Sequence, residues 1–428
     1  MEFSHFTFLV VVMIDGFRGN DYNMEYKMCG KNVKTRRKNM SENIFLKKNP
    51  PDSLEINQNI RNAAKADKMI YQMMHKDKVV AVIGSNGMVE IKNSEFLPYD
   101  LYLEEEHDFD TTMNNMMNFY HWCSSRVLTL DRKYAKEILN SIGVAQAVTD
   151  MDRARIALSY HCVSLMDVFW VKLSTENITF SDINLYDNHL NEALVDIPLR
   201  GKQMTVTNHE LAQDLSTGGY FPKAWIREST GFKLLKDGGA DVVRRELLAS
   251  YICQHFDVKQ VQYRSFIYEG EEVSESKIIT SKQYSIVSKM SYDIYACNHD
   301  LDTLEVCKQL DPETYYGMNI IDYLVGNTDR HPENWGFMVD NDTNKIISLY
   351  PLMDFNQSFQ SYDTLDGANC QTVLPHHLNQ REAAVEAVEN IGLRQLREVE
   401  LDRFGDMDKE RDMFERRLLE LKNAERKS

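Results

Sequence analysis

The chain has 428 residues, of which 43% are hydrophobic and 27% are charged, a composition typical of a globular protein with room for two domains or lobes. The formal net charge of −16 argues against a general nucleic-acid binder and against attachment to an anionic membrane, because both need basic surfaces. The longest apolar run, residues 6–14, is too short to cross a bilayer and lacks the flanks of a signal peptide, so we interpret it as a core strand.

The spacing of cysteine and histidine bears on location and on metal binding. The seven cysteines are scattered and form no Cys-x-x-Cys pair, which predicts reduced thiols in a cytoplasmic protein. The twelve histidines show no spacing typical of metal ligands. We therefore expect a cytoplasmic protein without a metal site built on Cys or His.

The first elements follow a segment that is hard to assign. Residues 31–48 are rich in Lys, Arg and Asn and precede two prolines, which favours a loop or linker. Residues 78–92 consist of two apolar runs around Gly-Ser-Asn-Gly and predict a β-hairpin. Helices should follow, one capped by Asp131 and reaching residue 139, and one capped by Asp150 and reaching residue 165.

A glycine pair precedes the next predicted strand. Ser216, Thr217, Gly218 and Gly219 come shortly before the strand that begins at Ala224. Two glycines let backbone N–H groups approach phosphate oxygens closely. A plain turn between strands is the commoner meaning of such a pair, so the segment predicts a phosphate-binding loop only together with its neighbours.

The strand predicted over residues 231–236 carries two lysines. Lys233 and Lys236 are three positions apart and therefore face opposite sides of a strand. Because Lys236 lies beside the Asp-Gly-Gly turn where a helix begins, we assign phosphate binding to Lys236 and expect Lys233 to face solvent.

The helix predicted over residues 240–256 contains a charged residue on its apolar side. An apolar stripe begins at Val242 and ends at Phe256, and Glu246 occupies the gap at i+4. A carboxylate on such a stripe is costly unless a cation meets it, and Lys236 is the nearest candidate in the sequence. Two alternatives stay open, namely that Glu246 reaches water at the stripe edge or pairs with a neighbouring arginine of the same helix.

A further helix leads into the most informative segment of the chain. Asp311 is a good N-cap, Pro312 suits the first helical position, and Gly326 ends the helix. Met318 and Val325 lie on its predicted apolar face.

The loop that follows reads Asn-Thr-Asp-Arg-His-Pro-Glu-Asn-Trp and supplies Asp329 and, five positions later, Asn334. A hairpin predicted over residues 336–350 would bring Asp354 back beside Asn334. Phosphoryl transfer from a magnesium nucleotide needs one carboxylate near the acceptor hydroxyl, plus an amide and a carboxylate that hold Mg²⁺. Each residue alone is a common turn or cap residue, but their order and spacing together favour the catalytic interpretation.

These residues resemble the HipA-like kinases, the catalytic subunits of bacterial toxin–antitoxin modules and their standalone relatives. The resemblance runs from about residue 78 to residue 374. The segments that carry it are Asn-Thr-Asp-Arg-His-Pro-Glu-Asn at 327–334, Leu-Tyr-Pro-Leu-Met-Asp-Phe at 349–355, Gly-Phe-Lys-Leu-Leu-Lys at 231–236, Arg-Glu-Leu-Leu-Ala-Ser at 245–250, and two upstream segments at 164–170 and 180–184.

The resemblance implies an α+β, bilobal protein-kinase-like fold with a sheet-containing N-lobe and a mainly helical C-lobe. It also implies ATP-dependent phosphorylation of Ser or Thr. The expected divisions are an unassigned N-terminal extension at 1–77, a HipA-like N-terminal region at 78–200, a nucleotide-binding N-lobe at 201–300 and a helical catalytic C-lobe at 301–428. Residues 380–428 should form packing helices without chemistry of their own.

The resemblance also implies roles for single residues. Asp329 is the catalytic carboxylate, and Asn334 and Asp354 hold Mg²⁺. Lys236 contacts the phosphates of ATP, and Glu246 positions Lys236.

The remaining roles belong to the two loops. Gly218 and Gly219 would lie against the nucleotide phosphates, and Ser216 and Thr217 are the hydroxyls nearest to the position that family members often autophosphorylate. The loop departs from the commoner family spacing. In the catalytic loop, His331 or Arg330 would steady the loop or the γ-phosphate, and the sequence does not choose between them.

Two other functions remain as alternatives. Phosphoinositide kinases also carry Asp-Arg-His-x-x-Asn, but their substrate lies at an anionic membrane, which suits a chain of charge −16 poorly. A kinase fold that binds nucleotide or a partner without turnover is the second alternative. We expect a protein substrate with a Ser or Thr acceptor, an antitoxin protein as a candidate partner, and neither direct nucleic-acid binding nor a membrane.

Overall fold

The computed structural model describes residues 69–127, 149–188, 211–212, 223–228, 231–268, 270–361 and 363–428. All of these residues belong to one compact unit, Asn62–Ser428. The core strand expected at 6–14, the linker at 31–48 and the helix expected from Asp131 lie outside the described residues.

The described strands are short and lie between residues 70 and 349. In chain order they are β1 (Ile70–His75), β2 (Lys78–Gly84), β3 (Val89–Ile91), β4 (Phe169–Leu173), β5 (Leu211–Ala212), β6 (Lys223–Glu228), β7 (Gly231–Lys236), β8 (Tyr263–Tyr268), β9 (Glu271–Lys277), β10 (Tyr284–Ser288), β11 (Gly336–Asp340) and β12 (Lys345–Leu349).

The described helices are concentrated in the second half of the chain. They are the 3₁₀ turn η1 (Ser94–Phe96), α3 (Phe109–Ser125), α5 (Asp150–Ser159), α6 (Phe180–Ile183), α8 (Ala240–Cys253), α9 (Lys289–Asn298), α10 (Thr303–Leu310), α11 (Pro312–Val325), α12 (Gln380–Ile391), the 3₁₀ turn η2 (Leu401–Phe404) and α13 (Asp408–Glu425).

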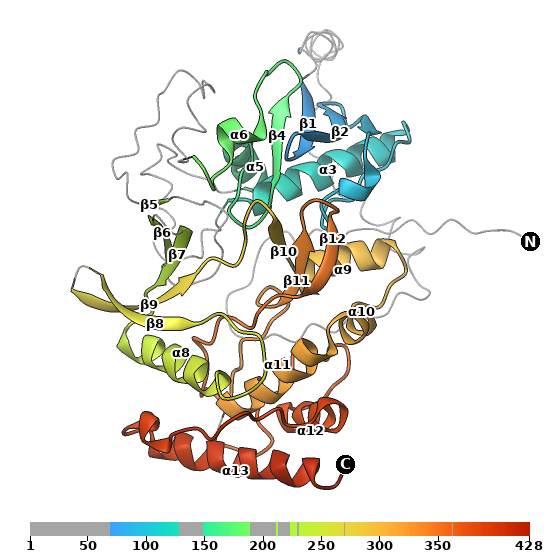
Figure 1. Cartoon of the computed structure of the whole chain (residues 1–428). Helices are drawn as coiled ribbons and strands as arrows, with labels where there is room; N and C mark the ends of the chain where they lie inside the picture. The colour runs from blue at the N-terminus through green and yellow to red at the C-terminus, as the bar shows by residue number, and fades with distance from the viewer. Residues whose placement is uncertain are drawn as a thin grey trace, which may run out of the picture. The chain divides into compact units, whose positions relative to one another are not determined.

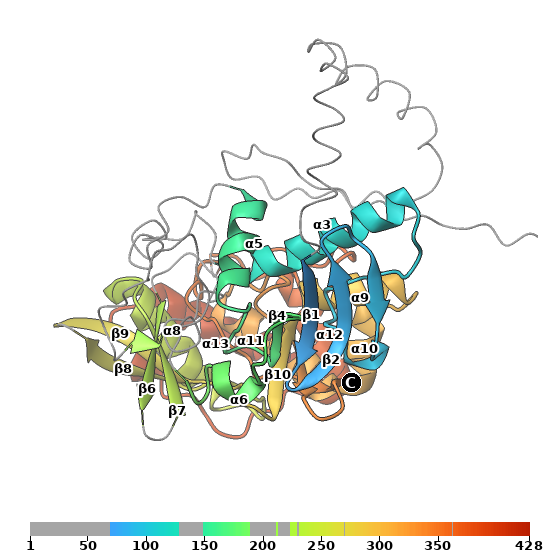
Figure 2. The same ribbon diagram turned by 90° about the horizontal axis from the view of Figure 1, so that it is seen from above.

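The described strands pair into three antiparallel sheets (Figure 1). Their strand orders are β3-β2-β1-β4, β5-β6-β7-β9-β8 and β10-β11-β12. Helices α3 and α5 pack together beside the first sheet, as Figure 2 shows, and α8 contacts β8 and β9 of the second. The described part of the chain therefore has a mixed α and β fold with separate antiparallel sheets and helices.

The hairpin expected over residues 78–92 is confirmed by the pairing of β2 with β3. Strand β1 comes before this hairpin and pairs with β2 on one side and β4 on the other. The division expected between residues 77 and 78 therefore falls in the turn between two paired strands of one sheet. The sequence did not reveal β1, because its run of Ile, Tyr, Gln, Met and His has weak alternation.

The helix expected from Asp150 to residue 165 is shorter than predicted, and its cap is different. Thr149 is the N-cap of α5, because its hydroxyl accepts from the Asp152 amide while the Asp152 carboxylate accepts from the Thr149 amide. The helix ends at Ser159. His161 and Cys162 soon afterwards have φ values of 61° and 56°, which a right-handed helix does not allow.

Helix α8 is close to its prediction. It ends at Cys253 rather than at residue 256, and its buried side starts at Val243 rather than at the half-buried Val242. Glu246 lies on this buried side with 1% of its surface exposed. The carboxylate is therefore in the core, and the alternative that it reaches water is wrong.

Helix α11 has the predicted limits. The Asp311 side chain accepts from the Thr314 amide, Pro312 opens the helix, and Gly326 closes it with φ 57° and ψ 40°. The expected single apolar face is too narrow a description, because every residue from Thr314 to Val325 is buried.

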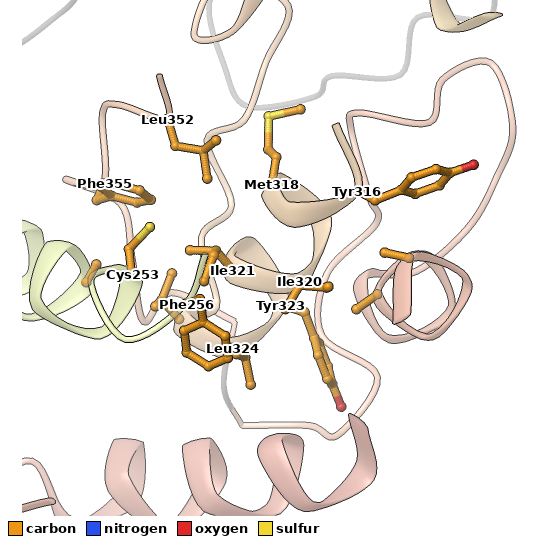
Figure 3. Packing of buried hydrophobic residues seen from close by; sticks show 14 of the residues in the cluster. Cys253, Phe256, Tyr316, Met318, Ile320, Ile321, Tyr323, Leu324, Leu352 and Phe355 are labelled. Carbon is orange, nitrogen blue, oxygen red and sulfur yellow. The ribbon is translucent and has the colours of Figure 1, made fainter. Parts of the chain in front are cut away.

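The burial of α11 fixes the position of the helix that leads into the loop at 327–335. Figure 3 shows Ile321 and Leu324 of α11 in the same cluster as Cys253 of α8 and Leu352 and Phe355 of the segment after β12. These side chains come from three separate stretches of the chain. Their packing therefore joins the helix before the loop, the helix that carries Glu246, and the segment that carries Asp354.

The end of the chain packs as expected, with one exception. Helix α12 contacts α11 and α13, and Phe404, Phe414 and Leu421 are buried. Leu396 is 67% exposed, because it lies in the irregular segment between α12 and η2 rather than on a helix. Helices α12 and α13 therefore pack against α11.

Two expectations from composition can be compared with the described residues. The cysteines among them, Cys123, Cys162, Cys253, Cys297, Cys307 and Cys370, are all free thiols. Within the same ranges, no helix combines the length and the apolar character that crossing a membrane requires.

Candidate functional site

The predicted lysine–glutamate pair is present between β7 and α8. Lys236, the last residue of β7, places Nζ 3.0 Å from Glu246 Oε1. The Ser274 hydroxyl on β9 donates to the other carboxylate oxygen. Arg244 turns away to Asp406 and the Phe404 carbonyl, so it is not the partner of Glu246.

Lys233 lies on the other side of β7, as the strand period requires, but it does not simply face solvent. Its Nζ is 2.9 Å from Glu228 Oε1 and 3.1 Å from Glu275 Oε2, and the residue is half-buried. Glu228 and Glu275 come from the neighbouring strands β6 and β9. The sequence could not show this pairing, because sheet order decides which side chains become neighbours.

Asp354 joins this pair from the far side of the site. Lys236 Nζ is 3.0 Å from Asp354 Oδ1, and Lys223 Nζ on β6 is 3.7 Å from Oδ2. Burial alone would raise the pKa of Asp354, but the two ammonium groups outweigh it and hold the pKa well below its usual range. Asp354 is therefore a carboxylate anion in a largely buried setting.

The backbone at Asp354 is unusual. Its φ is +60°, a value that few residues other than glycine adopt without strain. The Asp354 amide donates to the Tyr263 hydroxyl at 3.0 Å, and Lys236 Nζ lies 3.5 Å from the same oxygen. Tyr263 thus holds both the backbone of Asp354 and the lysine that meets its carboxylate.

The loop after α11 is held by hydrogen bonds between its own residues and to Asp322 of α11. Asn327 donates its side-chain amide to Asp322 Oδ1 at 3.0 Å, and its own side-chain oxygen accepts from the Asp329 amide at 3.2 Å. Asn334 donates to the Asp329 carbonyl at 2.7 Å. The loop therefore brings the backbone of Asp329 and the side chain of Asn334 into direct contact.

Arg330 connects this loop to the segment that carries Asp354. Its guanidinium bonds to both Asp322 oxygens, at 2.9 and 3.0 Å, and to the Asn334 carbonyl at 3.1 Å. A further bond reaches the carbonyl of Met353, the residue before Asp354. With 3% of its surface exposed, Arg330 fixes the loop from inside.

The Asp329 carboxylate is more accessible than the Arg330 side chain, and its protonation is perturbed. Burial raises the pKa of Asp329, His331 opposes this rise, and the Asp354 carboxylate adds to it, so that the net pKa is raised. His331 Nε2 lies 3.7 Å from Asp329 Oδ1. The negative charge of Asp354 therefore acts on the Asp329 carboxylate.

The structure therefore brings most of the predicted site residues together. Lys236 contacts both Glu246 and Asp354, and Asp329 and Asn334 belong to the adjoining loop. Ser216, Thr217, Gly218 and Gly219 lie outside the described residues. Among the described residues, no group of three or more His, Cys, Asp or Glu side chains is arranged to hold a metal ion.

Sequence reasoning missed two residues of this cluster. Lys223 follows the glycine pair, and its register opposite Lys236 in the sheet brings it to Asp354. Tyr263 begins β8 and reaches back to the Asp354 backbone. Neither position carried a local signal, because a lysine and a tyrosine at strand ends are usually surface residues.

The sequence matches no protein-family model and no curated protein. The fold is similar to that of the proinflammatory kinase CtkA of Helicobacter pylori, at 16% identity and TM-score 0.41, over 51% of this chain and 95% of that one.

A second similar structure is a chain of the Shewanella oneidensis MR-1 toxin–antitoxin complex of HipA, HipB and operator DNA. That likeness has 10% identity and TM-score 0.48, over 83% of this chain and 99% of the other. Both TM-scores are below 0.5, so neither likeness bears on the function of the site residues.

Proposed function

We propose that this protein transfers the γ-phosphoryl group of ATP to a hydroxyl of a protein substrate. The observation that carries the proposal is Lys236, whose Nζ lies 3.0 Å from both Glu246 and Asp354. In protein kinases, a lysine–glutamate pair and a metal-binding aspartate must both be in place for phosphoryl transfer. Here the glutamate partner, Glu246, and the proposed metal-binding aspartate, Asp354, both contact the ammonium group of Lys236.

The donor set suits a magnesium ion, which prefers oxygen ligands. Asp354 is ionised, and Asn334 uses its amide nitrogen within the loop, so its amide oxygen is the atom for a metal. These two residues would hold the ion, and the ion would neutralise charge on the phosphate oxygens.

Asp329 is proposed as the group that accepts the hydrogen bond, and then the proton, of the acceptor hydroxyl. Its raised pKa makes the ionised form a better proton acceptor than an ordinary aspartate. Lys236 would contact the phosphates with Glu246 behind it, and Gly218 and Gly219 would lie over them. Positioning and charge stabilisation then supply most of the rate.

Arg330 and His331 take different parts in this proposal. Arg330 is buried and bonded to Asp322, Asn334 and Met353, which supports a role in holding the loop. His331 lies beside the Asp329 carboxylate and would tune its charge.

The finer features of the proposal follow the family resemblance. We infer a bilobal arrangement in which the sheet β5-β6-β7-β9-β8 with α8 forms the N-lobe and helices α10 to α13 form most of the C-lobe. We also infer a Ser or Thr acceptor, a cytoplasmic location and an antitoxin as a candidate partner. Ser216 or Thr217 would be the position modified if the protein phosphorylates itself.

The test is transfer of label from γ-labelled ATP, with the purified protein, a cell extract and phosphoinositide vesicles as separate acceptors. We expect label on protein, and Asp329→Asn should lower the turnover by about 10²–10⁴. Asp342→Asn is the matched control, because Asp342 lies in the β11–β12 turn and pairs with Lys76.

Three results would contradict the proposal. Equal labelling by Asp329→Asn would remove the catalytic role of Asp329. Label on lipid alone would favour a lipid kinase, and thermal stabilisation by ATP without transfer to any acceptor would favour a binding module.

A further inference from the structure

Asp354 lies in a backbone conformation that the rest of the protein has to maintain. Its φ is +60°, in the left-handed region where a residue with a Cβ is strained. Such a conformation persists only when the surrounding structure over-determines it. The residues on either side are held separately, because the Met353 carbonyl accepts from Arg330 and the Phe355 ring is fully buried in the cluster of Figure 3.

The peptide of Asp354 itself is held by the Tyr263 hydroxyl, which accepts from the Asp354 amide at 3.0 Å. The same oxygen lies 3.5 Å from Lys236 Nζ. Tyr263 is only 7% exposed, and its ring meets the Phe355 ring edge-on, with the centroids 6.5 Å apart. An aromatic ring that packing keeps in place therefore presents one oxygen to the strained peptide.

The position of Tyr263 in the fold is set by elements other than the one that carries Asp354. Tyr263 is the first residue of β8, which pairs with β9, and its amide donates to the Ser250 hydroxyl of α8 at 3.3 Å. Asp354 comes after β12, in a different stretch of the chain. The hydroxyl therefore joins the sheet that carries Lys236 to the segment that carries the proposed metal ligand.

The hydroxyl and the ring of Tyr263 can be separated by a single change. Phenylalanine keeps the ring and its contact with Phe355, so a role in packing alone predicts no effect of the change. Without the hydroxyl, however, the Asp354 amide loses its hydrogen-bond acceptor in a residue that is only 9% exposed. Since an unsatisfied buried donor costs free energy, the strained conformation would become less favourable relative to its alternatives.

We propose that Tyr263 is a positioning residue for the metal site, whose hydroxyl holds the peptide of Asp354 in the conformation from which the carboxylate binds a divalent cation. This inference rests on the proposed function, because it takes Asp354 as a metal ligand. Tyr263 acts through Asp354 and binds neither metal nor nucleotide itself. Loss of the hydroxyl should therefore weaken the binding of metal more than the binding of metal-free nucleotide.

The test compares wild type with Tyr263→Phe and measures ATP affinity by calorimetry, in EDTA and in Mg²⁺. The ratio of the two dissociation constants should fall about fivefold to tenfold in the variant, the scale of a buried donor that loses its partner. Affinity in EDTA should change far less, because Lys236 keeps its contact with Glu246. Electron paramagnetic resonance of Mn²⁺ in the presence of ADP measures the bound metal directly and does not depend on catalysis.

Two further variants serve as controls. Tyr323→Phe also removes the hydroxyl of a buried tyrosine, but this hydroxyl donates to the Leu365 carbonyl at 2.9 Å, outside the proposed site. It should leave the effect of Mg²⁺ on ATP affinity unchanged. In an Asp354→Asn background there is no carboxylate to position, so Tyr263→Phe should have little further effect on metal binding. Thermal unfolding of each variant shows that it is folded.

The outcomes separate this inference from the proposed function. Unchanged metal binding in Tyr263→Phe would overturn the positioning role even if wild type transfers phosphate. Equal losses of ATP affinity in EDTA and in Mg²⁺ would also overturn it, because the hydroxyl would then act through Lys236. Reduced metal binding in Tyr263→Phe, with a wild type that binds Mg²⁺ and ATP but never transfers phosphate, would support the positioning role and overturn the kinase. A wild type that binds neither Mn²⁺ nor ATP would overturn both.

Discussion

Glu246 is a carboxylate in the interior of the protein, and its position depends on the groups that meet it. Lys236 approaches one oxygen at 3.0 Å, and the Ser274 hydroxyl donates to the other. Burial raises the cost of an unpaired charge, so each member of this cluster needs the others. Single residues of the site should therefore affect stability as well as activity.

Replacing Glu246 by Ala should lower the free energy of unfolding by about 3 kcal/mol, because it removes a partner of a buried lysine. Glu272→Ala is the control, since Glu272 is exposed on β9 and should change stability by no more than about 0.5 kcal/mol. Urea unfolding of both variants measures the difference. Equal stability of the two would show that Asp354 alone satisfies Lys236.

The raised pKa of Asp329 predicts a pH effect. A base is inactive when protonated, so kcat/KM should fall as pH drops through this raised pKa, above the range of an ordinary aspartate. His331 lowers the pKa of Asp329, so His331→Gln should raise it further and move the acid limb to higher pH.

A pH–rate profile of wild type and His331→Gln measures this shift. His299→Gln is the control, because His299 is an exposed residue stacked on Tyr295. A lower plateau with an unmoved acid limb would instead place His331 on the substrate phosphate.

At the level of elements, the end of α11 determines where the loop that carries Asp329 and Asn334 begins. Gly326 takes a left-handed conformation with φ 57°. A Cβ at this position would lie 2.8 Å from the Ser361 carbonyl oxygen. Nearby, Arg417 of α13 donates to the carbonyls of Tyr323, Ser361 and Thr364. The helix end is thus closed by a glycine and by a buried cation.

Gly326→Ala should lower the free energy of unfolding by about 2 kcal/mol or more, from backbone strain together with the close approach to Ser361. Gly270→Ala is a matched control, because Gly270 has φ 90° but no atom within 4 Å of a built Cβ. The Gly270→Ala change adds backbone strain without a close contact, so it should lower the free energy of unfolding less than Gly326→Ala does. Thermal unfolding of both proteins tests this, and a larger loss at Gly270 would contradict the role of the contact.

At the level of the compact unit, the β11–β12 hairpin contacts stretches of the chain that are distant in sequence. Strand β10 pairs with β11, and the Ile286 amide donates to the Met166 carbonyl at 3.1 Å. In the hairpin turn, Asn344 donates to the carbonyls of Glu95 and Leu97 at 3.1 and 3.0 Å. The hairpin that leads to Asp354 is therefore attached to the region before β4.

Asn344→Ala should lower the free energy of unfolding by about 2 kcal/mol, because the hydrogen bonds to the Glu95 and Leu97 carbonyls are lost and the left-handed backbone loses a tolerant residue. Lys76→Ala removes the ion pair with Asp342 between the same two regions, but this pair is exposed and should contribute less than about 1 kcal/mol. Hydrogen exchange in β2 and β12 would locate the loss. Similar effects of the two changes would argue against Asn344 as the main attachment.

Local sequence patterns predicted the elements whose conformation depends only on neighbouring residues. The cap at Asp311 with Pro312, the stop at Gly326, and the hairpins at β2–β3 and β11–β12 follow from backbone preferences that neighbouring residues set. The order and spacing of Asp329, Asn334 and Asp354 likewise predicted a catalytic loop, and that role stays a prediction. Two predictions were wrong. The N-cap of α5 is Thr149 rather than Asp150, and α11 is buried on all sides rather than on one apolar face.

The sequence by itself determined which chemical groups the protein has and which of them lie near one another along the chain, including Lys236 on a strand and Glu246 on the next helix. Only the tertiary structure decided that Asp354, more than a hundred positions after Lys236, shares its ammonium, and that Lys223 stands opposite it. The physical reason is that sheet register and the packing of α11 bring these groups together through space. Contacts between residues far apart in the chain leave no local pattern from which they can be predicted.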